Sequence, residues 1–112
     1  MLGVTFKEDV PDVRNSKAVD VIDEVRSFGL TLQVCDPEAD ARAAKHEYGI
    51  ELVALDAMEK ADALIINVAH RAFVEAGWDL VMRLLNPGGV VLDVKGYLDR
   101  AKTPDGVILW RM

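Results

Sequence analysis

The sequence lacks a glycine-rich phosphate loop, although its beginning has the layout of a site that usually carries one. An apolar run from Leu2 to Phe6 predicts a short buried strand, and residues 16–28 predict a helix after the polar loop that follows. Dinucleotide sites at such a junction use the pattern G-x-G-x-x-G, which lets the backbone approach a pyrophosphate. Only Gly3 is present here, and it lies inside the predicted strand. The standard dinucleotide fingerprint is therefore excluded.

Cysteine, positive charge and long apolar runs are also scarce. The single cysteine, Cys35, excludes an internal disulfide and favours a reduced, cytosolic setting. A net charge of −6 argues against non-specific binding to nucleic acid or to anionic membranes. No apolar run approaches the length of a membrane span, and the N-terminus has no signal-peptide pattern. Any anion site must therefore be a local group of cations.

The sequence does contain one domain's length, 112 residues, in which strand and helix patterns alternate. The predicted strands are residues 2–6, 30–35, 50–53, 63–69, 90–93 and 107–110. The predicted helices are residues 16–28, 38–48 and 71–85, with a helical turn at 57–61, a turn at 86–89 and a break at Gly77. Asn15 or Ser16 is expected to cap the first helix, and Gly29 to end it.

This alternation predicts an α/β domain with a Rossmann-like, doubly wound parallel sheet in three layers, α/β/α. In the usual winding, the strands at 2–6 and 63–69 lie side by side. The loops after residues 6, 69 and 93 then surround one crevice at the carboxyl edge of the sheet, where such folds bind their ligands.

Three cations are expected around that crevice. Lys7 offers a point charge, and Arg14 offers a planar fork just before a helix N-terminus, which itself favours an anion. Lys95 follows the strand at 90–93. Together they favour a diphosphate ligand. The alternative is a structural cluster in which the first two cations pair with the acids of their own loop, Glu8, Asp9 and Asp12.

The remaining candidates are ambiguous. Asp36 ends the second strand, where dinucleotide folds often place a carboxylate on a ribose hydroxyl, but without the glycines a turn that starts the next helix is the better interpretation. His70 and Arg71 follow the central strand at the crevice. His70 is either a group that donates to a ligand or titrates near neutral pH, or a solvated or capping residue. Nothing near Cys35 in the sequence activates a thiolate, so a structural role is expected. No residue pair has specific metal-ligand spacing.

The first loop also carries a family resemblance. The segment "GVTFKEDVPDVRNSKAVDVIDEV" resembles the pattern G-x-x-F-K-x-x-x-x-D-x-R-x-S/T in the C-terminal domain of the UDP-glucose and GDP-mannose dehydrogenases. The segments "VCDPEAD", "HEYGI", "ADALIINVAHRAF", "GGVVLDVKG" and "LWRM" match in the same order. The resemblance covers essentially the whole chain, residues 1–112, and is strongest to the bacterial enzymes that act on UDP-N-acetylhexosamines for capsule or O-antigen sugars.

The resemblance implies a division of labour within a longer, cytoplasmic, homodimeric enzyme. This enzyme would oxidise the 6-hydroxymethyl group of a UDP-sugar, either a UDP-N-acetylhexosamine or UDP-glucose, to a carboxylate with NAD. A missing N-terminal domain would bind NAD, and a missing central domain would supply the catalytic cysteine. By motif, Phe6, Lys7 and Lys95 would contact the UDP-sugar, and Arg14 would reach toward NAD.

Cys35 does not match the family's nucleophile, so the chain alone is expected to be inactive. Met1 is interpreted as a start placed at a domain boundary. Two alternatives remain. One is a stand-alone nucleotide-binding or regulatory module without catalysis. The other is a complete small NAD-binding protein, against which the missing glycines weigh.

Overall fold

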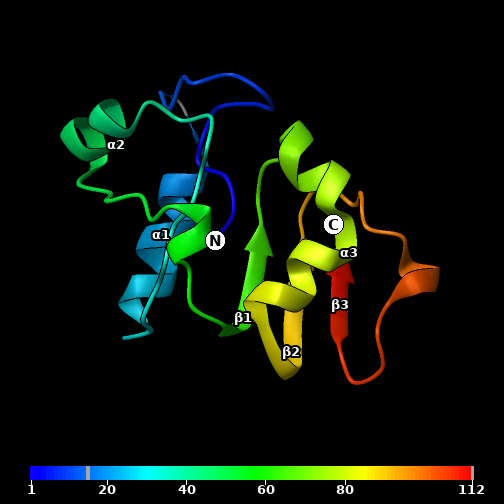
Figure 1. The fold of residues 1–112 in the computed structure, drawn as a ribbon. Coiled ribbons are helices and arrows are strands. Elements are labelled where there is room, and N and C mark those ends of the chain that lie inside the picture. Colours follow the sequence, from blue (N-terminus) through cyan, green and yellow to red (C-terminus); the bar gives the residue numbers. More distant parts are fainter. Residues whose placement is uncertain (15, 112) are drawn as a thin grey trace.

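The chain folds around a parallel sheet. The computed structural model describes residues 1–14 and 16–111. The sheet has the strand order β1 (Ala61–Ile66), β2 (Leu85–Asp93) and β3 (Ile108–Arg111). The helices are α1 (Ala18–Ser27), α2 (Ala41–Tyr48) and α3 (Arg71–Leu84), with 3-10 turns η1 (Leu55–Ala57) and η2 (Arg100–Lys102). The predicted α/β class with parallel strands is confirmed (Figure 1).

Isolated contacts extend the sheet beyond β1. Leu2 forms parallel bridges to Ile66 on one side and to Cys35 on the other. Next along, the amide of Val53 donates to the carbonyl oxygen of Val34 at 2.7 Å. The segments therefore run edge to edge from 53 through 34–35, 2, β1 and β2 to β3, which is the winding that places the crevice beside Leu2. The predicted neighbourhood of Leu2 and the central strand is confirmed.

The first predicted strand, residues 2–6, is shorter than expected. Gly3 has a φ of +97°, which takes the backbone out of the extended region and ends the ladder. The next two amides do not pair with a strand. Val4 and Thr5 donate instead to the carboxylate of Asp36, at 2.7 and 3.2 Å. The prediction of a full strand here was wrong because a buried side chain takes up the hydrogen bonds that a neighbouring strand would have accepted.

Other predicted boundaries also shift. The predicted strands at 30–35 and 50–53 contribute only the isolated contacts described above. The helical turn expected at 57–61 lies earlier, at η1, because Ala61 already pairs in β1. Helix α1 begins at Ala18, whose amide donates to the hydroxyl of Ser16 at 3.1 Å. Asn15, the other expected cap, lies outside the described residues.

Glycines interrupt the regular structure in the second half of the chain. The backbone of α3 leaves helical geometry at Gly77, with φ 51° and ψ −136°, so the predicted break is confirmed. The pairing of β1 with β2 shifts register between Ala61 and Ala63, because residues 86–89 loop out of the ladder. The predicted turn at residues 86–89 is therefore an irregularity inside β2, which begins at Leu85, and the prediction that the strand starts only at residue 90 was wrong.

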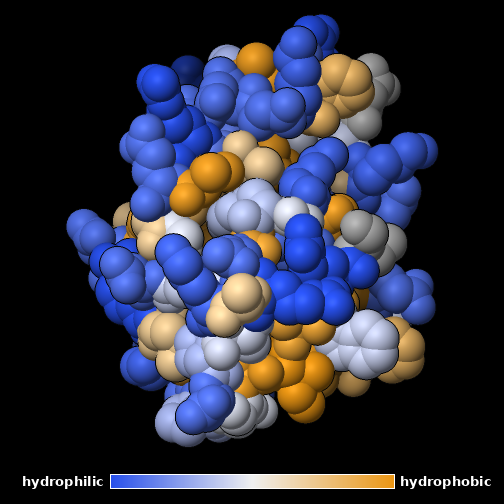
Figure 2. Space-filling model, turned by 90° about the vertical axis from the view of Figure 1, so that its right-hand side faces the viewer, coloured by the Kyte–Doolittle hydropathy of each residue, from blue (hydrophilic) through white to orange (hydrophobic). Residues whose placement is uncertain are grey.

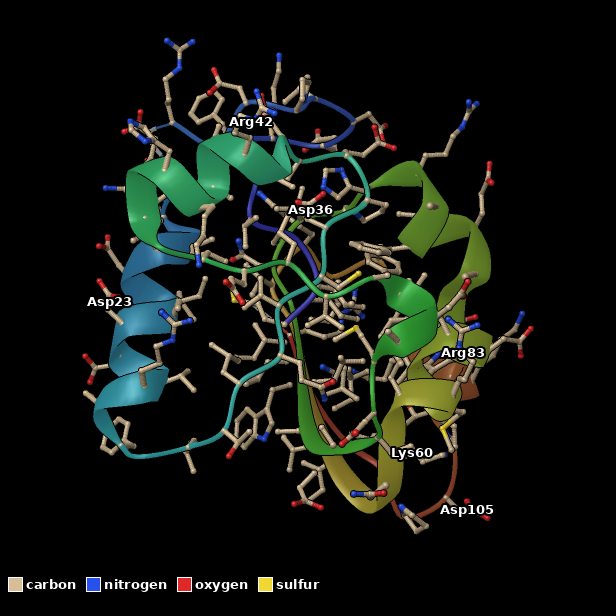
Figure 3. The ribbon with its side chains drawn as sticks, turned by 60° about the vertical axis from the view of Figure 1, so that its left-hand side comes forward. Asp23, Asp36, Arg42, Lys60, Arg83 and Asp105 are labelled. Carbon is tan, nitrogen blue, oxygen red and sulfur yellow. The ribbon has the colours of Figure 1, made fainter. Side chains whose placement is uncertain are left out.

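Helix α3 covers one face of the sheet, and helices α1 and α2 cover the other. Leu64 and Ile66 of β1 pack in one cluster with Phe73 of α3, whereas Ile65 packs against the cluster formed with α1 and α2. Figure 3 shows α1 and α2 on one side of the sheet and α3 on the other. Phe73 is fully buried, which contributes roughly 3 kcal/mol by transfer from water.

The face that carries α1 and α2 is open over β3. Val107 and Leu109 pack toward the α3 side, so the alternation of a strand turns Ile108 and Trp110 to the opposite face. Their side chains are 51% and 62% exposed. Figure 2, which views the molecule from the β3 side, shows a hydrophobic patch in its lower half. Within residues 1–14 and 16–111, no helix is long and apolar enough to cross a membrane.

We expect Gly3→Ala to reduce the free energy of unfolding by about 3 kcal/mol or more, measured by urea denaturation. An added Cβ would lie 2.6 Å from the Cβ of Val68 and 2.8 Å from its backbone nitrogen, so overpacking adds to the strain of a positive φ. Gly106→Ala is the matched control, because Gly106 has a φ of +83° but no heavy atom within 4 Å of the added Cβ. Equal losses in the two variants would show that Val68 moves aside without cost.

Candidate functional site

A buried carboxylate and a buried imidazole lie at the carboxyl edge of the sheet. Asp36 follows Cys35, and His70 follows β1, on either side of the segment that starts with Leu2. The Nε2 atom of His70 lies 2.9 Å from the Asp36 carboxylate, and both side chains are fully inaccessible to solvent. Figure 3 shows Asp36 beneath the loops at the upper end of the sheet. The pair therefore forms the floor of the predicted crevice rather than an open part of it.

Both carboxylate oxygens of Asp36 accept hydrogen bonds from backbone amides, in addition to the contact with His70. One oxygen accepts from the amides of Val4 and Thr5, and the other accepts from the amides of Glu38 and Ala39, at 2.9 and 3.0 Å. Burial by itself raises the pKa of this carboxyl, but the His70 hydrogen bond and the backbone amides outweigh it and leave the pKa lowered. Asp36 is thus the turn residue that the sequence suggested, and its oxygens are occupied by the protein rather than offered to a ribose.

His70 ties the first loop to the sheet. Its Nδ1 accepts the amide of Asp9 at 2.9 Å, so Nδ1 carries no proton and Nε2 is the donor. The Nε2–H group is shared between Asp36 and the hydroxyl of Thr5, 3.2 Å away. The Thr5 hydroxyl has its own proton free to donate to the carbonyl oxygen of Lys7 at 2.8 Å. One imidazole therefore fixes the backbone on both sides of Lys7.

Asp9 completes this anchor from the other side. It adopts a φ of 60°, a conformation that aspartate tolerates better than most residues. Its Oδ1 accepts the amide of Arg71 at 2.8 Å, which satisfies one of the free N–H groups at the start of α3. The first loop and the N-terminus of α3, more than sixty residues apart in sequence, are therefore joined by two hydrogen bonds at one residue.

The side chains that this anchored loop presents are exposed. Phe6 is 58% exposed, and its amide donates to the carbonyl oxygen of Asp12 at 2.8 Å, which closes the base of the loop. Lys7 is exposed as well. Within the described part of the chain, Lys7 forms no ion pair, so its charge is available at the surface.

Arg14 lies in a different setting from Lys7. Its guanidinium pairs with Asp12, with Nε and Nη2 at 3.1 and 3.2 Å from the two carboxylate oxygens, and the side chain is 76% exposed. The hydrogen bonds and charge of Arg14 lower the pKa of the Asp12 carboxyl. Arg14 also lines a cavity of about 290 Å³ together with residues of α2, among them Glu47. The structural ion pair that the sequence offered as an alternative exists for Arg14.

Lys95 lies in a turn organised by another buried carboxylate. Asp93, at the end of β2, is fully buried and accepts the amides of Gly96 and Leu98 at 2.9 and 2.8 Å. Lys95 stands on this turn and is exposed. The amide of Val94 donates to the carbonyl oxygen of Ile66, the last residue of β1, at 3.0 Å. The turn therefore lies at the same carboxyl edge of the sheet as the first loop.

The structure corrects the expectation that His70 faces a ligand, whereas a ligand role of Arg71 stays a prediction. His70 presents neither nitrogen to a ligand, because the ring is fully buried and both nitrogens bind protein groups. Arg71 contributes its amide to the anchor, while its exposed guanidinium pairs with Glu75, one turn further along α3, with Nε 3.4 Å from Oε1.

A second cavity, about 330 Å³, lies elsewhere, between the Gly77 break in α3 and the segment around Tyr97. Burial raises the pKa of the Tyr97 hydroxyl, which has no hydrogen-bond partner within the described residues. Neither of the two cavities is lined by Lys7 or Lys95.

Cys35 is buried, and its burial raises the pKa of the thiol to about 11. At neutral pH it is a thiol rather than a thiolate nucleophile. Within residues 1–14 and 16–111, no group of three or more His, Cys, Asp or Glu side chains is placed to hold a metal ion.

Comparison with known proteins shows which family this domain belongs to. The UDP-binding domain of the UDP-glucose/GDP-mannose dehydrogenase family matches residues 1–100. The chain is 34% identical over its full length to Protein CapL of Staphylococcus aureus, covering 26% of that protein. It is 37% identical over 92% of its length to a UDP-N-acetyl-D-glucosamine 6-dehydrogenase of Pseudomonas aeruginosa, covering 24% of it. The chain belongs to the UDP-glucose/GDP-mannose dehydrogenase family.

The fold has a solved counterpart. A UDP-D-ManNAc dehydrogenase from Pyrococcus horikoshii superposes with a TM-score of 0.71 at 21% identity, over 98% of this chain and 24% of that one. The chain therefore spans about a quarter of the length of the relatives that it matches.

We expect Asp36→Asn to reduce the free energy of unfolding at pH 7 by about 3 kcal/mol, measured by urea denaturation. All five of its partners are donors and each carboxylate oxygen accepts from at least two, so the NH₂ of an asparagine would face at least two donors in a buried site. Because the folded pKa of Asp36 is lowered, its contribution is fully present above the unfolded pKa of about 4 and is lost as the pH falls through the folded value.

The wild-type chain should therefore lose stability below about pH 4 more steeply than Asp36→Asn does. Asp105→Asn, at an exposed residue far from the network, is the control and should follow the wild type. Identical acid slopes in all three proteins would contradict the role assigned to Asp36.

Proposed function

We propose that the chain is the nucleotide-binding part of an NAD-dependent nucleotide-sugar 6-dehydrogenase, with UDP-N-acetylhexosamines as the substrate class. The observation that carries this proposal is the match of residues 1–100 to the UDP-binding domain of the family. The similarity to relatives whose names include UDP-N-acetyl-D-glucosamine 6-dehydrogenase supports the choice of sugar. The full enzyme would be a cytoplasmic homodimer in which other domains bind NAD and carry the catalytic cysteine.

Phe6 and Lys7 are the proposed contacts to the UDP moiety. A nucleoside diphosphate carries negative charge, and a chain with net charge −6 repels it unless a local cation compensates. Lys7 is such a cation, on a backbone held at two points by hydrogen bonds. The exposed ring of Phe6 beside it suits contact with a sugar or a base. We assign Lys95 to the same ligand, as a second cation at this edge of the sheet.

Arg14 is the proposed contact to the NAD held by another domain. Its exposure and its place at the α2 end of the loop support a role separate from that of Lys7. Its ion pair with Asp12 holds the guanidinium in one orientation without burying it.

We expect Lys7→Ala to weaken UDP binding to the 112-residue chain about tenfold or more, because one charged hydrogen bond is worth about 1.5–3 kcal/mol. Arg14→Ala, which removes the second exposed cation of the same loop, should change UDP affinity less than twofold. Chemical-shift titration with UDP, uridine and GDP measures these affinities. In the full-length enzyme, Lys7→Ala should raise the KM for the UDP-sugar and Arg14→Ala the KM for NAD.

The proposal fails if the wild-type chain shows no saturable shift with UDP. If both variants lose only UDP affinity, or neither changes any affinity, Lys7 and Arg14 serve the loop's own structure.

We expect the 112-residue chain alone to reduce no NAD in the presence of UDP-N-acetylglucosamine. It lacks the glycine fingerprint, and Cys35, its only thiol, is buried and protonated at neutral pH. Absorbance at the wavelength of NADH measures the reaction, with a complete relative of the family as positive control. Turnover above background that disappears in Cys35→Ser would overturn both the inactivity and the structural role of that cysteine.

A further inference from the structure

We propose that His70 is a positioning residue for nucleotide binding, which acts through Asp9 to hold Lys7 and Phe6 at the carboxyl edge of the sheet. This inference rests on the proposed function of the Phe6–Lys7 loop. His70 touches no ligand itself, since its ring is fully buried. Its effect on affinity comes from two backbone contacts that flank Lys7.

The two contacts use the two ring nitrogens. Nδ1 accepts the Asp9 amide at 2.9 Å, two residues after Lys7. Nε2–H reaches the hydroxyl of Thr5 at 3.2 Å, two residues before Lys7, and that hydroxyl donates to the Lys7 carbonyl oxygen. The loop between these points is exposed, and the imidazole is the buried group that reaches both of its ends. A flexible loop would have to be ordered when the nucleotide binds, and a loop that is already fixed avoids that entropic cost.

Two carboxylates and one aromatic ring surround the His70 imidazole. The carboxylates nearest the ring are Asp36, 2.9 Å from Nε2, and Asp9, whose Oδ1 is 3.9 Å from Nδ1. Asp9 is turned toward the amide of Arg71, and the rings of Phe73 and His70 pack edge to face, with centroids 5.5 Å apart. Asp36 fixes the donor at Nε2, and this leaves Nδ1 as the acceptor that the loop requires.

Two substitutions separate the two nitrogens. In His70→Asn, the side-chain oxygen stands where Nδ1 stands and can accept the Asp9 amide, but the donor to Asp36 is lost. In His70→Gln, the longer amide can reach Asp36 as a donor, but no acceptor remains for the Asp9 amide. Both variants lose the packing of the ring on Phe73, so loss of stability alone does not distinguish them.

We expect His70→Gln to weaken UDP binding about tenfold and His70→Asn to weaken it less than threefold, measured by chemical-shift titration of variants that urea denaturation shows to be folded. In the His70→Gln background, Lys7→Ala should cause little further loss, because both changes act on the same contact. Equal affinities of His70→Gln and His70→Asn, or additive losses in the double variant, would overturn the proposal.

Measurements on the wild type keep the inference testable if either variant fails to fold. Two-bond correlations between ring protons and nitrogens should show an unprotonated Nδ1 and a protonated Nε2, and the Asp9 amide should exchange slowly with solvent. A protonated Nδ1 or fast exchange at Asp9 would overturn the anchor even if UDP binds. Absence of UDP binding to a wild type with a protected Asp9 amide would instead overturn the proposed function and, with it, any role of the anchor in affinity.

Discussion

The structure depends on one buried carboxylate. Asp36 collects four backbone amides and one imidazole N–H at the point where the chain leaves its second strand segment. These donors come from three parts of the sequence: the end of the Leu2 segment, the turn before α2, and the start of α3. Because an unpaired carboxylate in such a place would cost several kcal/mol, all three parts must be present together for the edge of the sheet to form. The position of Lys7 follows from that requirement.

Other carboxylates at this edge of the sheet also accept hydrogen bonds from backbone amides. Asp93 folds the turn that carries Lys95, and Asp9 joins the first loop to the N-terminus of α3. Each carboxylate accepts backbone amides and leaves a cation exposed nearby. An acidic domain can therefore present positive charge locally, because two of its carboxylates, Asp36 and Asp93, are buried as hydrogen-bond acceptors instead of adding to the surface charge.

The sequence predicted the features that follow from local apolar patterns. It missed the contacts between side chains that are far apart in the sequence. Alternating apolar patterns gave the α/β class, the neighbourhood of Leu2 and β1, and the break at Gly77. They overestimated the strand at 2–6, because the competing acceptor is the side chain of Asp36, far away in sequence. They also left the role of His70 open. A usable signal existed, since Asp36 and His70 each directly follow a segment that the predicted winding places beside Leu2, and both must reach the same edge. The hydrogen-bond roles of the two nitrogens are set by the Asp9 amide and the Asp36 carboxylate, and no spacing pattern reveals the contact with Asp9.

The open face of β3 has a consequence for how the chain behaves in concentrated solution. Ile108 and Trp110 present apolar surface on a parallel sheet, a type of sheet that is ordinarily covered on both faces. At neutral pH the net charge of −6 keeps molecules apart in spite of this surface. Near the isoelectric point of about 4.8 that repulsion vanishes while the apolar surface remains. The colloidal stability of the chain should therefore reach its minimum there, at a pH where the buried Asp36 network still holds the fold together.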